Sequence, residues 1–471
     1  MSGVHYDSLL SVAGRIRRGE LTSAAVTAEL LDRIARHDGR LNSALLVLTG
    51  DAMAQARQAD AEIAAGNWRG PLHGVPLGIK DLLWTKGLPT TAGMDVLRDF
   101  RPEEDATVVA RLKQAGAVII AKLHMTEGAT FNHHPVFPQP VNPWSAAHWT
   151  GVSSSGSGIA PAAGFCFGAI GSDTGGSIRM PSAANNLTGI KPTWGRVSRH
   201  GVIHLAESLD HLGPMARSAA DAAAILQAIA GWDPKDTTTL TDPVPDYLAQ
   251  IDGGVSGLTL GIDWTFAAGG MADEIVASLE NTRAVLERLG VTVREVAFPW
   301  DEQEMADSRT LFGAEIALAH EAWFPAQAER YGAWLRGTLQ DVGQIRGVDV
   351  ARGHMLRERF RGRLRAMFAE VDLVLVPALG RPLPTWAEIE PMAQGEVPMD
   401  ADLMRFTSPF NLAGSPTITL PAGFGADGLP MGVQLAGAWL AEPTLIRAGA
   451  AFQRETDFHA RHPELETEKS A

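Results

Sequence analysis

The chain has 471 residues, with 54 acidic against 40 basic side chains and a formal net charge of −14 at pH 7. This excess argues against a nucleic-acid-binding surface, which needs clustered cations. Hydrophobic residues make up 45% of the chain, and no apolar run approaches the ~18 residues that span a bilayer. Because the N-terminus also lacks a secretory pattern, we expect a soluble cytoplasmic protein with no membrane contact.

The chain contains one cysteine, Cys166, which lies inside the apolar run 160–170. A single cysteine excludes an intrachain disulfide. Its apolar neighbours indicate a small buried core residue rather than a nucleophile.

The first third of the chain shows helical and strand periodicity in turn. Apolar spacing predicts two amphipathic helices between Tyr6 and Arg36, and Thr22 or Ser23 is expected to cap the second. Strands and helices then alternate: strand 44–48, helix 51–65, strand 75–80, a helix capped by Asp105 and ending at Gln114, strand 117–122, helix 158–163 and strand 165–170.

The remaining elements continue this rhythm after a Pro- and Thr-rich surface excursion at 233–245. They are strands 258–262, 291–296, 371–376, 417–420 and 432–435, helix 273–289 and a mainly helical region at about 300–370. The alternation predicts an α/β fold, with a mixed, mostly parallel sheet sandwiched between helices. Residues 1–70 are expected to form a helical segment that packs on one large domain, 71–471.

Five arginines alternate along the last part of the helical region. They are Arg357, Arg359, Arg361, Arg363 and Arg365. We interpret them as a solvated helix face; the alternative is a surface that captures an anionic substrate or partner.

Two turns built from glycine and serine, residues 151–158 and 171–179, flank the apolar run. Glycine lets backbone N–H groups point at a ligand without a side chain in the way. Such turns suit bound phosphates or the oxyanion that forms during acyl transfer. The alternative is that both are plain loops at the edge of a sheet.

A lysine ends the apolar strand before these turns. If Lys80 is buried, lost hydration favours its neutral form, which can accept protons near pH 7. The alternative is an exposed lysine paired with Asp81. Serine is the candidate nucleophile, but Gly-x-Ser-x-Gly and Ser-x-x-Lys motifs are absent from the sequence, and no motif joins His204 and Asp210 to Ser177. Metal-binding and Walker motifs are absent too, so no metal or cofactor is expected.

Several ordered segments together resemble the amidase signature family. They are 74–81, 153–157, 171–181, 189–198, 208–214 and 406–414. The resemblance extends from about residue 7 to 455 and is weakest at 300–370. It implies the amidase signature fold and hydrolysis of a carbon–nitrogen (amide) bond, with aryl esters or carbamates as further substrates.

The resemblance also implies a Ser–Ser–Lys triad. Ser177 matches the nucleophile, Ser153 the bridging serine that follows a cis peptide bond, and Lys80 the base. The oxyanion hole falls on the backbone N–H groups of Thr174, Gly175, Gly176 and Ser177.

Other residues near the motifs are assigned supporting roles. Asp173 and Arg179 flank the nucleophile turn, and we expect them to hold it by a buried ion pair. Phe131, Trp149, Ile203 and His204 are candidates to line a substrate pocket. The expected substrate is a small amide-type molecule, and a homodimer is expected by analogy with relatives.

Two positions depart from the family pattern. Val152 replaces the usual Gly before the bridging serine, so the bond between Val152 and Ser153 could be cis or trans. Met180 replaces the Gln that amidotransferase A-subunits tend to carry, which favours a stand-alone hydrolase. The alternatives are an A-subunit-like glutamine-dependent amidotransferase that works with partner subunits, and a catalytically inactive binding protein of the same fold.

Overall fold

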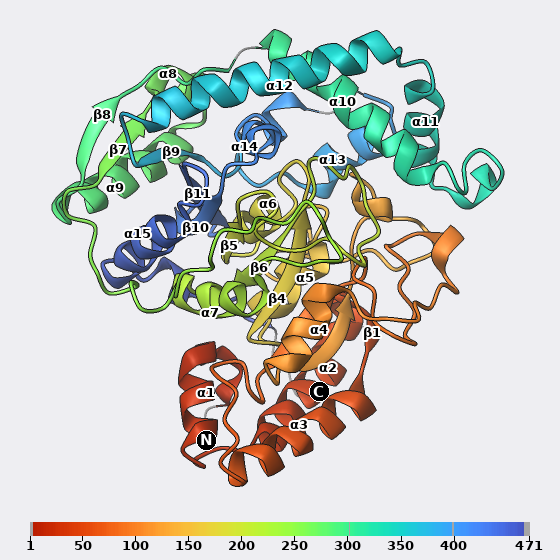
Figure 1. The fold of residues 1–471 in the computed structure, drawn as a ribbon, viewed down its shortest axis with the longest axis vertical. Coiled ribbons are helices and arrows are strands. Elements are labelled where there is room, and N and C mark those ends of the chain that lie inside the picture. Colours follow the sequence, from red (N-terminus) through yellow and green to blue (C-terminus); the bar gives the residue numbers. More distant parts are fainter. Residues whose placement is uncertain (1–2, 301, 398–399, 466–471) are drawn as a thin grey trace.

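One large twisted sheet organises the computed structural model, which describes residues 3–300, 302–397 and 400–465 (Figure 1). Within these ranges the sheet has eleven strands in the order β1-β3-β2-β4-β6-β5-β10-β11-β9-β7-β8. The strands are β1 (Ala44–Val47), β2 (Pro76–Lys80), β3 (Val118–Leu123), β4 (Gly168–Asp173), β5 (Thr188–Lys191), β6 (His211–Ala216), β7 (Thr259–Ile262), β8 (Thr292–Glu295), β9 (Leu373–Pro377), β10 (Thr417–Phe424) and β11 (Pro430–Gly437).

The sheet is mixed, as predicted, and less parallel than expected. Of the ten neighbouring pairs in the described sheet, four are parallel (β3–β2, β2–β4, β9–β7 and β7–β8) and six are antiparallel. The parallel pairs lie toward the two sides, and the central pairs are antiparallel; among these, β10 and β11 form a hairpin through the short loop 425–429. The side containing β2 and β4 carries Lys80 and the two turns built from glycine and serine.

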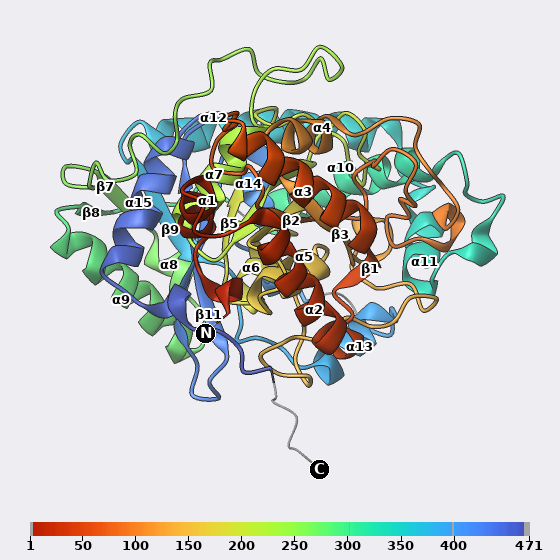
Figure 2. The ribbon, with the colours of Figure 1, turned by 90° about the horizontal axis from the view of Figure 1, so that it is seen from below.

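Helices cover both faces of the sheet. In Figure 2, strand β5 lies between helix α7 on one side and helix α6 on the other. The helices are α1 (Leu9–Arg17), α2 (Ser23–Leu41), α3 (Thr49–Ala64), α4 (Thr107–Gln114), α5 (Ser155–Ala162), α6 (Arg179–Ala184), α7 (Ala219–Ile229), α8 (Trp264–Ala268), α9 (Asp273–Arg288), α10 (Glu302–His320), α11 (Ala333–Val342), α12 (Gly347–Phe368), α13 (Trp386–Ala393), α14 (Ser408–Ala413) and α15 (Glu442–Arg454). This arrangement confirms the predicted α/β fold with a helix-covered sheet.

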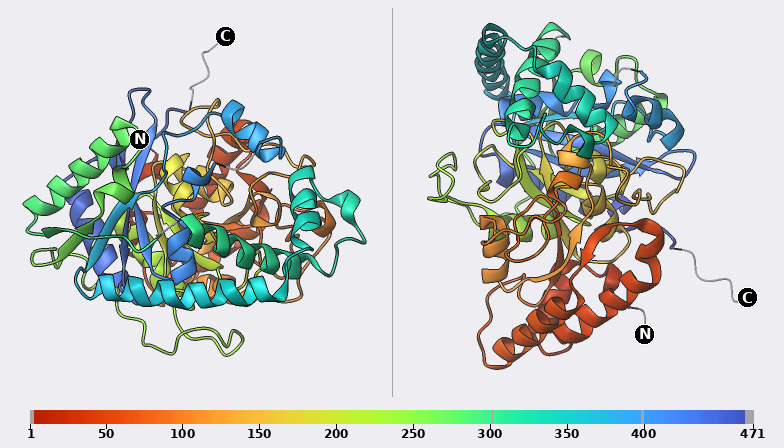
Figure 3. Two further views of the ribbon diagram at one scale, coloured as in Figure 1. Left: turned by 90° about the horizontal axis from the view of Figure 1, so that it is seen from above. Right: turned by 90° about the vertical axis from the view of Figure 1, so that its right-hand side faces the viewer.

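The N-terminal helices and the mainly helical region lie at opposite ends of the molecule. Figure 3 shows α1–α3 in red at one end and α10–α12 in cyan at the other. Thr22 caps α2, as predicted, because its side chain accepts a hydrogen bond from Ala25 N. The apolar stripe of α2, which includes Leu30 and Ile34, is buried in the main core.

One local prediction was wrong, and another holds only in part. Asp105 does not cap α4: its carboxylate accepts from Lys86 N and pairs with Lys113, while the N-cap is Ala106 without a side-chain bond. The arginine series is only in part a solvated face: Arg359, Arg363 and Arg365 are exposed, but residues two apart point to different sides of a helix. Arg357 is buried and donates to Leu412 O and Ser208.

The cysteine prediction is confirmed. Cys166 is 1% exposed and packs in the main core, where burial raises the pKa of its thiol to about 12. Among the described helices, none combines the length and the apolar character needed to cross a bilayer.

Candidate active site

The site forms where two parallel strands end side by side. Strand β2 pairs with β4 through Ile79 and Ile170, so both strands reach the same edge of the sheet. Lys80 is the last residue of β2, and Ser172 lies one residue before the end of β4. Parallel pairing therefore brings a lysine and a serine together that are 92 residues apart in the chain.

Lys80 contacts three serine hydroxyl groups. Its Nζ lies 2.7 Å from Ser153 Oγ, 2.8 Å from Ser154 Oγ and 2.8 Å from Ser172 Oγ. Its side chain is fully buried. The exposed lysine paired with Asp81 is therefore excluded; Asp81 instead pairs with the neighbouring buried Lys122 at 3.3 Å.

Burial changes the proton affinity of this amine. Desolvation holds the pKa of Lys80 well below its usual value of 10.5, while the charges of Asp173 and Asp210 act in the opposite direction. A lysine in this setting loses its proton at a much lower pH than an exposed one. It is thus suited to act as a base toward a hydroxyl group.

The serine cluster precedes and begins helix α5. The peptide bond between Val152 and Ser153 is cis. Ser153 O accepts a hydrogen bond from Thr126 N at 3.1 Å, which ties this turn to the loop that follows β3. Ser154 Oγ also donates to Ser172 O, so the turn is fixed to the end of β4.

The second glycine turn joins β4 to α6 and carries Ser177. The Asp173 carboxylate lies inside it and accepts from Gly176 N at 2.9 Å and Ile178 N at 3.0 Å. Arg179 donates to both carboxylate oxygens, and both side chains are fully buried. Although burial alone raises the pKa of Asp173, the Arg179 guanidinium and its hydrogen bonds hold that pKa well below its usual range.

The backbone of this turn requires glycine at position 176. Its φ is +136°, and a Cβ there would lie 2.7 Å from Thr407 Oγ1. Gly176 N already donates to Asp173, so it is engaged in holding the turn. Within the described chain, the N–H groups of Thr174, Gly175 and Ser177 donate to no protein acceptor.

Ser177 lies at the wall of a pocket whose other walls are almost entirely apolar. The lining residues are Ala129, Thr130, Phe131, Val152, Gly175, Ser177, Met180, Leu205, Phe312, Trp334, Leu403 and Met404. Of the residues predicted to bind substrate, Phe131 lines this pocket. Trp149 is buried behind it, with the two ring centroids 6.2 Å apart, whereas Ile203 and His204 are not in the lining.

His204 instead belongs to a polar array next to the nucleophile turn. Its Nδ1 lies 3.2 Å from Asp210 Oδ2, and Thr174 Oγ1 donates to the other Asp210 oxygen at 2.6 Å. Burial lowers the pKa of His204, but the hydrogen bond and charge of Asp210 outweigh it and raise the pKa above 6.5. The array therefore links an imidazole to the turn that carries Ser177.

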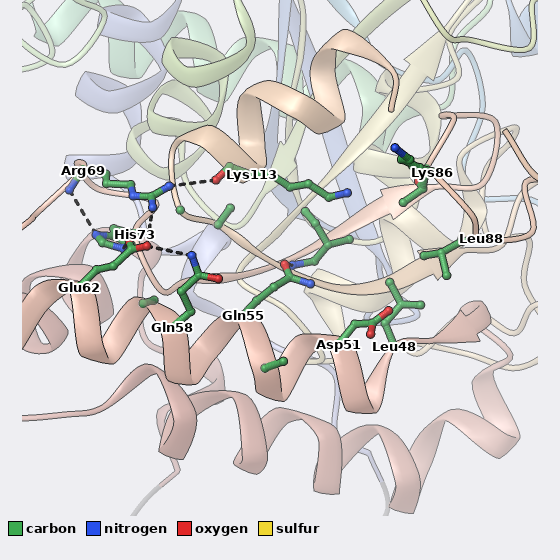
Figure 4. Close-up of a pocket in the computed structure, with 16 residues that line it drawn as sticks. Leu48, Asp51, Gln55, Gln58, Glu62, Arg69, His73, Lys86, Leu88 and Lys113 are labelled. Atoms are coloured by element: carbon green, nitrogen blue, oxygen red, sulfur yellow. Dashed lines mark hydrogen bonds and ion pairs between the residues drawn. The ribbon is translucent and has the colours of Figure 1, made fainter. Parts of the chain in front are cut away.

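A cavity larger than the Ser177 pocket, about 490 Å³, lies elsewhere (Figure 4). It is a cleft between α3 and the segments around Lys86 and Lys113, and its lining includes none of the predicted site residues. Glu62 pairs with Arg69 and His73 at one end. The cleft holds no nucleophile beside a buried base, so its size does not make it the catalytic centre.

Three residues beside this chemistry were missed by the sequence analysis. Ser154 and Ser172 share Lys80 with Ser153, and Glu127 is a buried carboxyl on the loop that lines the pocket. Ser154 lies in segment 153–157 and Ser172 in segment 171–181. Both segments contain other serines, and nothing in the sequence singled these two out as partners of Lys80. For Glu127 the sequence gives no signal of burial.

Comparison with known proteins finds relatives that match nearly the whole chain. Residues 25–446 match the family described as Amidase. The chain is 46% identical to "Putative amidase AmiD" of Mycobacterium tuberculosis, over 97% of this chain and 95% of the relative. It is 38% identical to the A-subunit of the glutamyl-tRNA(Gln) amidotransferase of Roseiflexus castenholzii, over 97% of each.

A solved structure agrees as well. The native peptide amidase of Stenotrophomonas maltophilia superposes with a TM-score of 0.84 at 32% identity, covering 98% of this chain and 99% of that one. The match of family, relatives and structure extends over nearly the whole chain. The chain therefore belongs to the amidase signature family of carbon–nitrogen hydrolases and their relatives.

Proposed function

We propose that this protein hydrolyses the carbon–nitrogen bond of a small amide through an acyl-enzyme on Ser177, with Ser153 as the bridging serine and Lys80 as the base. The observation that carries the proposal is the buried Lys80 amine, 2.7 Å from the Oγ of Ser153, whose neighbour Val152 lines the same apolar pocket as Ser177. An amine without its proton can accept one through a hydroxyl chain.

The three hydroxyl groups around Lys80 can partner a neutral amine as well as an ammonium, and burial favours the neutral form. A neutral amine has two N–H donors and one lone pair, and three hydroxyl groups surround this one. The hydrogen of Ser154 is already donated to Ser172 O, so Ser154 accepts from Lys80. If Ser172 takes the second N–H, the lone pair is left for the hydroxyl hydrogen of Ser153.

The proposed reaction has two halves. Ser177 Oγ attacks the carbonyl carbon, its proton passes to Ser153, and the proton of Ser153 passes to Lys80. The relay then returns a proton to the nitrogen of the leaving amine as the carbon–nitrogen bond breaks. Water reverses the sequence on the acyl-enzyme and releases the acid. The oxyanion would be held by the N–H groups of Thr174, Gly175 and Ser177, which have no protein acceptor in the described chain.

The pocket favours an uncharged substrate. Its lining contains no ionisable side chain among the residues described there, and an unpaired charge would be costly to bury in it. A matched panel of a linear anilide, a C-terminal peptide amide, a cyclic amide, an aryl ester and a carbamate would rank the preferred bond. Two of these follow the solved relatives, a peptide amidase and the 6-aminohexanoate cyclic dimer hydrolase.

A fluorophosphonate probe tests the nucleophile directly. Mass spectrometry should locate the adduct on Ser177, and labelling should disappear in Ser177→Ala. Lys80→Ala should slow it by at least about 10³-fold, since loss of a member of a catalytic set has effects of this size or larger. Lys235→Ala, which removes an exposed lysine, is the matched control and should label normally. An adduct on another residue would reject the proposal.

A second candidate is a glutamine-dependent amidotransferase component that works with partner subunits. The 38% identity to an amidotransferase A-subunit over 97% of both chains favours it. Met180 in the pocket wall and the apolar lining count against binding of glutamine, whose α-amino and α-carboxylate groups need polar partners. Transfer of ammonia that requires ATP and partner subunits would support this alternative. Hydrolysis by the purified chain alone would support the first.

A further inference from the structure

One loop connects the Lys80 relay with the wall of the apolar pocket. At its start, Thr126 N donates to Ser153 O at 3.1 Å, and three residues further on Ala129, Thr130 and Phe131 line the pocket. Glu127 lies between these two contacts. A displacement of Glu127 would therefore move a segment that contacts both the bridging serine and the pocket.

The Glu127 carboxyl reaches out of this loop to helix α11. It is 2% exposed, and its two oxygens lie 3.0 and 3.2 Å from Gly332 N. Gly332 is the N-cap of α11, and Trp334, two residues later, lines the pocket. A Cβ at position 332 would lie 2.6 Å from Glu127 Oε2, so a larger residue there would displace the carboxylate.

We propose that Glu127 is a positioning residue, a proton-sensitive latch that holds the start of α11, and with it Trp334, over the Ser177 pocket. This role rests on the proposed function, since Glu127 would control the position of Trp334 in the wall of that same pocket. Nothing in the relay itself uses this carboxyl: Lys80 is surrounded by Ser153, Ser154 and Ser172.

The charged and titratable groups around Glu127 come from every neighbouring element. They are Asp95 before α4, His134 on its own loop, Arg336 on α11, Tyr331 and Arg330 just before α11, and His320 at the end of α10. Arg330 forms an ion pair with Asp95, with Nε 2.9 Å from Oδ2. His320 Nδ1 lies 3.2 Å from Tyr331 Oη, and burial lowers the pKa of His320 to about 4, so it stays neutral at pH 6–9.

The direction of the pH effect follows from burial. Burial raises the pKa of Glu127 from its ordinary 4.5 to about 7, against the opposing effects of Gly332 N and Arg336. When the ten-residue helix α11 detaches, it also unfolds, because a helix this short is marginal on its own. Water then reaches the carboxyl and its pKa returns toward 4.5. The closed arrangement thus binds the proton more tightly, and raising the pH through 7 favours opening. Between pH 6 and 8.5 these two values increase the opening equilibrium about tenfold.

Hydrogen–deuterium exchange of the full-length protein tests the latch without any turnover. After correction for intrinsic exchange rates, the protection of amides in 332–342 should fall about tenfold between pH 6 and 8.5. Glu127→Gln keeps a hydrogen-bond acceptor but cannot titrate, so its protection should change less than twofold. Gly332→Ala should lower protection already at pH 6, because its methyl group displaces the carboxyl.

The controls separate this proposal from the enzymatic one. Glu329→Gln removes an exposed carboxylate from the same region and should keep the tenfold change. The latch is overturned if wild-type protection in 332–342 changes less than twofold, or if Glu127→Gln retains the full change. Absent labelling of Ser177 would instead refute the hydrolase proposal and leave the exchange result standing.

Discussion

The ion pair inside the nucleophile turn predicts a large and specific loss of stability when it is broken. Arg179→Met removes the guanidinium that donates to both oxygens of Asp173, to Thr407 O and to Gln434 Oε1. Asp173 and Arg179 are fully buried, so water cannot replace the lost partner. Removing one member of a buried pair costs about 3–5 kcal/mol, because the other charge is left uncompensated.

Equilibrium urea unfolding, followed by tryptophan fluorescence, measures this loss. Asp173→Asn should also destabilise the protein, and the double variant Asp173→Asn/Arg179→Met should lose less than the sum of the two. A coupling of about 1–3 kcal/mol is expected for groups in direct contact. A loss below about 1 kcal/mol for Arg179→Met, or strict additivity in the double variant, would show that the pair does not hold the turn.

Three further outcomes follow from individual contacts. The ascending limb of kcat/KM against pH should lie well below 10.5, because the base is active once deprotonated and burial lowers the pKa of Lys80; a limb near 10.5 would contradict a buried base. Ser172→Ala removes one of three partners of Lys80 and should lower kcat about tenfold while Ser177 still labels, because a buried hydrogen bond that orients the base, worth about 1–1.5 kcal/mol, is lost. Cys166 should react with a thiol reagent only in denaturant, because it is 1% exposed and its pKa is raised to about 12; reaction in native buffer would contradict the core assignment.

Much of the sheet could be predicted from the sequence, and the exceptions have identifiable causes. Strand β6 contains Gly213 and Pro214, both disfavoured in strands, yet it lies between β4 and β5. It is tolerated because β5 pairs with β6 only at Met215 and Ala216, so Pro214 faces no partner on that side. Helix α7 is buried nearly all round and lacks the polar face from which a helix is recognised.

The candidate site likewise contains residues that could be predicted from the sequence and residues that could not. Ser153 and Ser177 stand in glycine- and serine-rich turns and Lys80 ends an apolar strand, but it was the resemblance to the amidase signature family that implied their roles as a triad. The contact between Lys80 and Ser172 depends on the register of two parallel strands, which residue order alone does not specify. Glu127 depends on a helix 205 residues away. Long-range pairing of this kind leaves no local pattern.

The buried charges near Lys80 explain why its amine can be neutral. Two carboxylates, Asp173 and Asp210, favour the charged ammonium, and unopposed they would hold the proton on it. Each carboxylate has other partners. Asp173 forms an ion pair with the guanidinium of Arg179, and Asp210 forms hydrogen bonds with the hydroxyl of Thr174 and the imidazole of His204. The remaining partners of Lys80 are uncharged hydroxyls, so desolvation decides its proton affinity. The carboxylates can thus shape the nucleophile turn without disabling the base beside it.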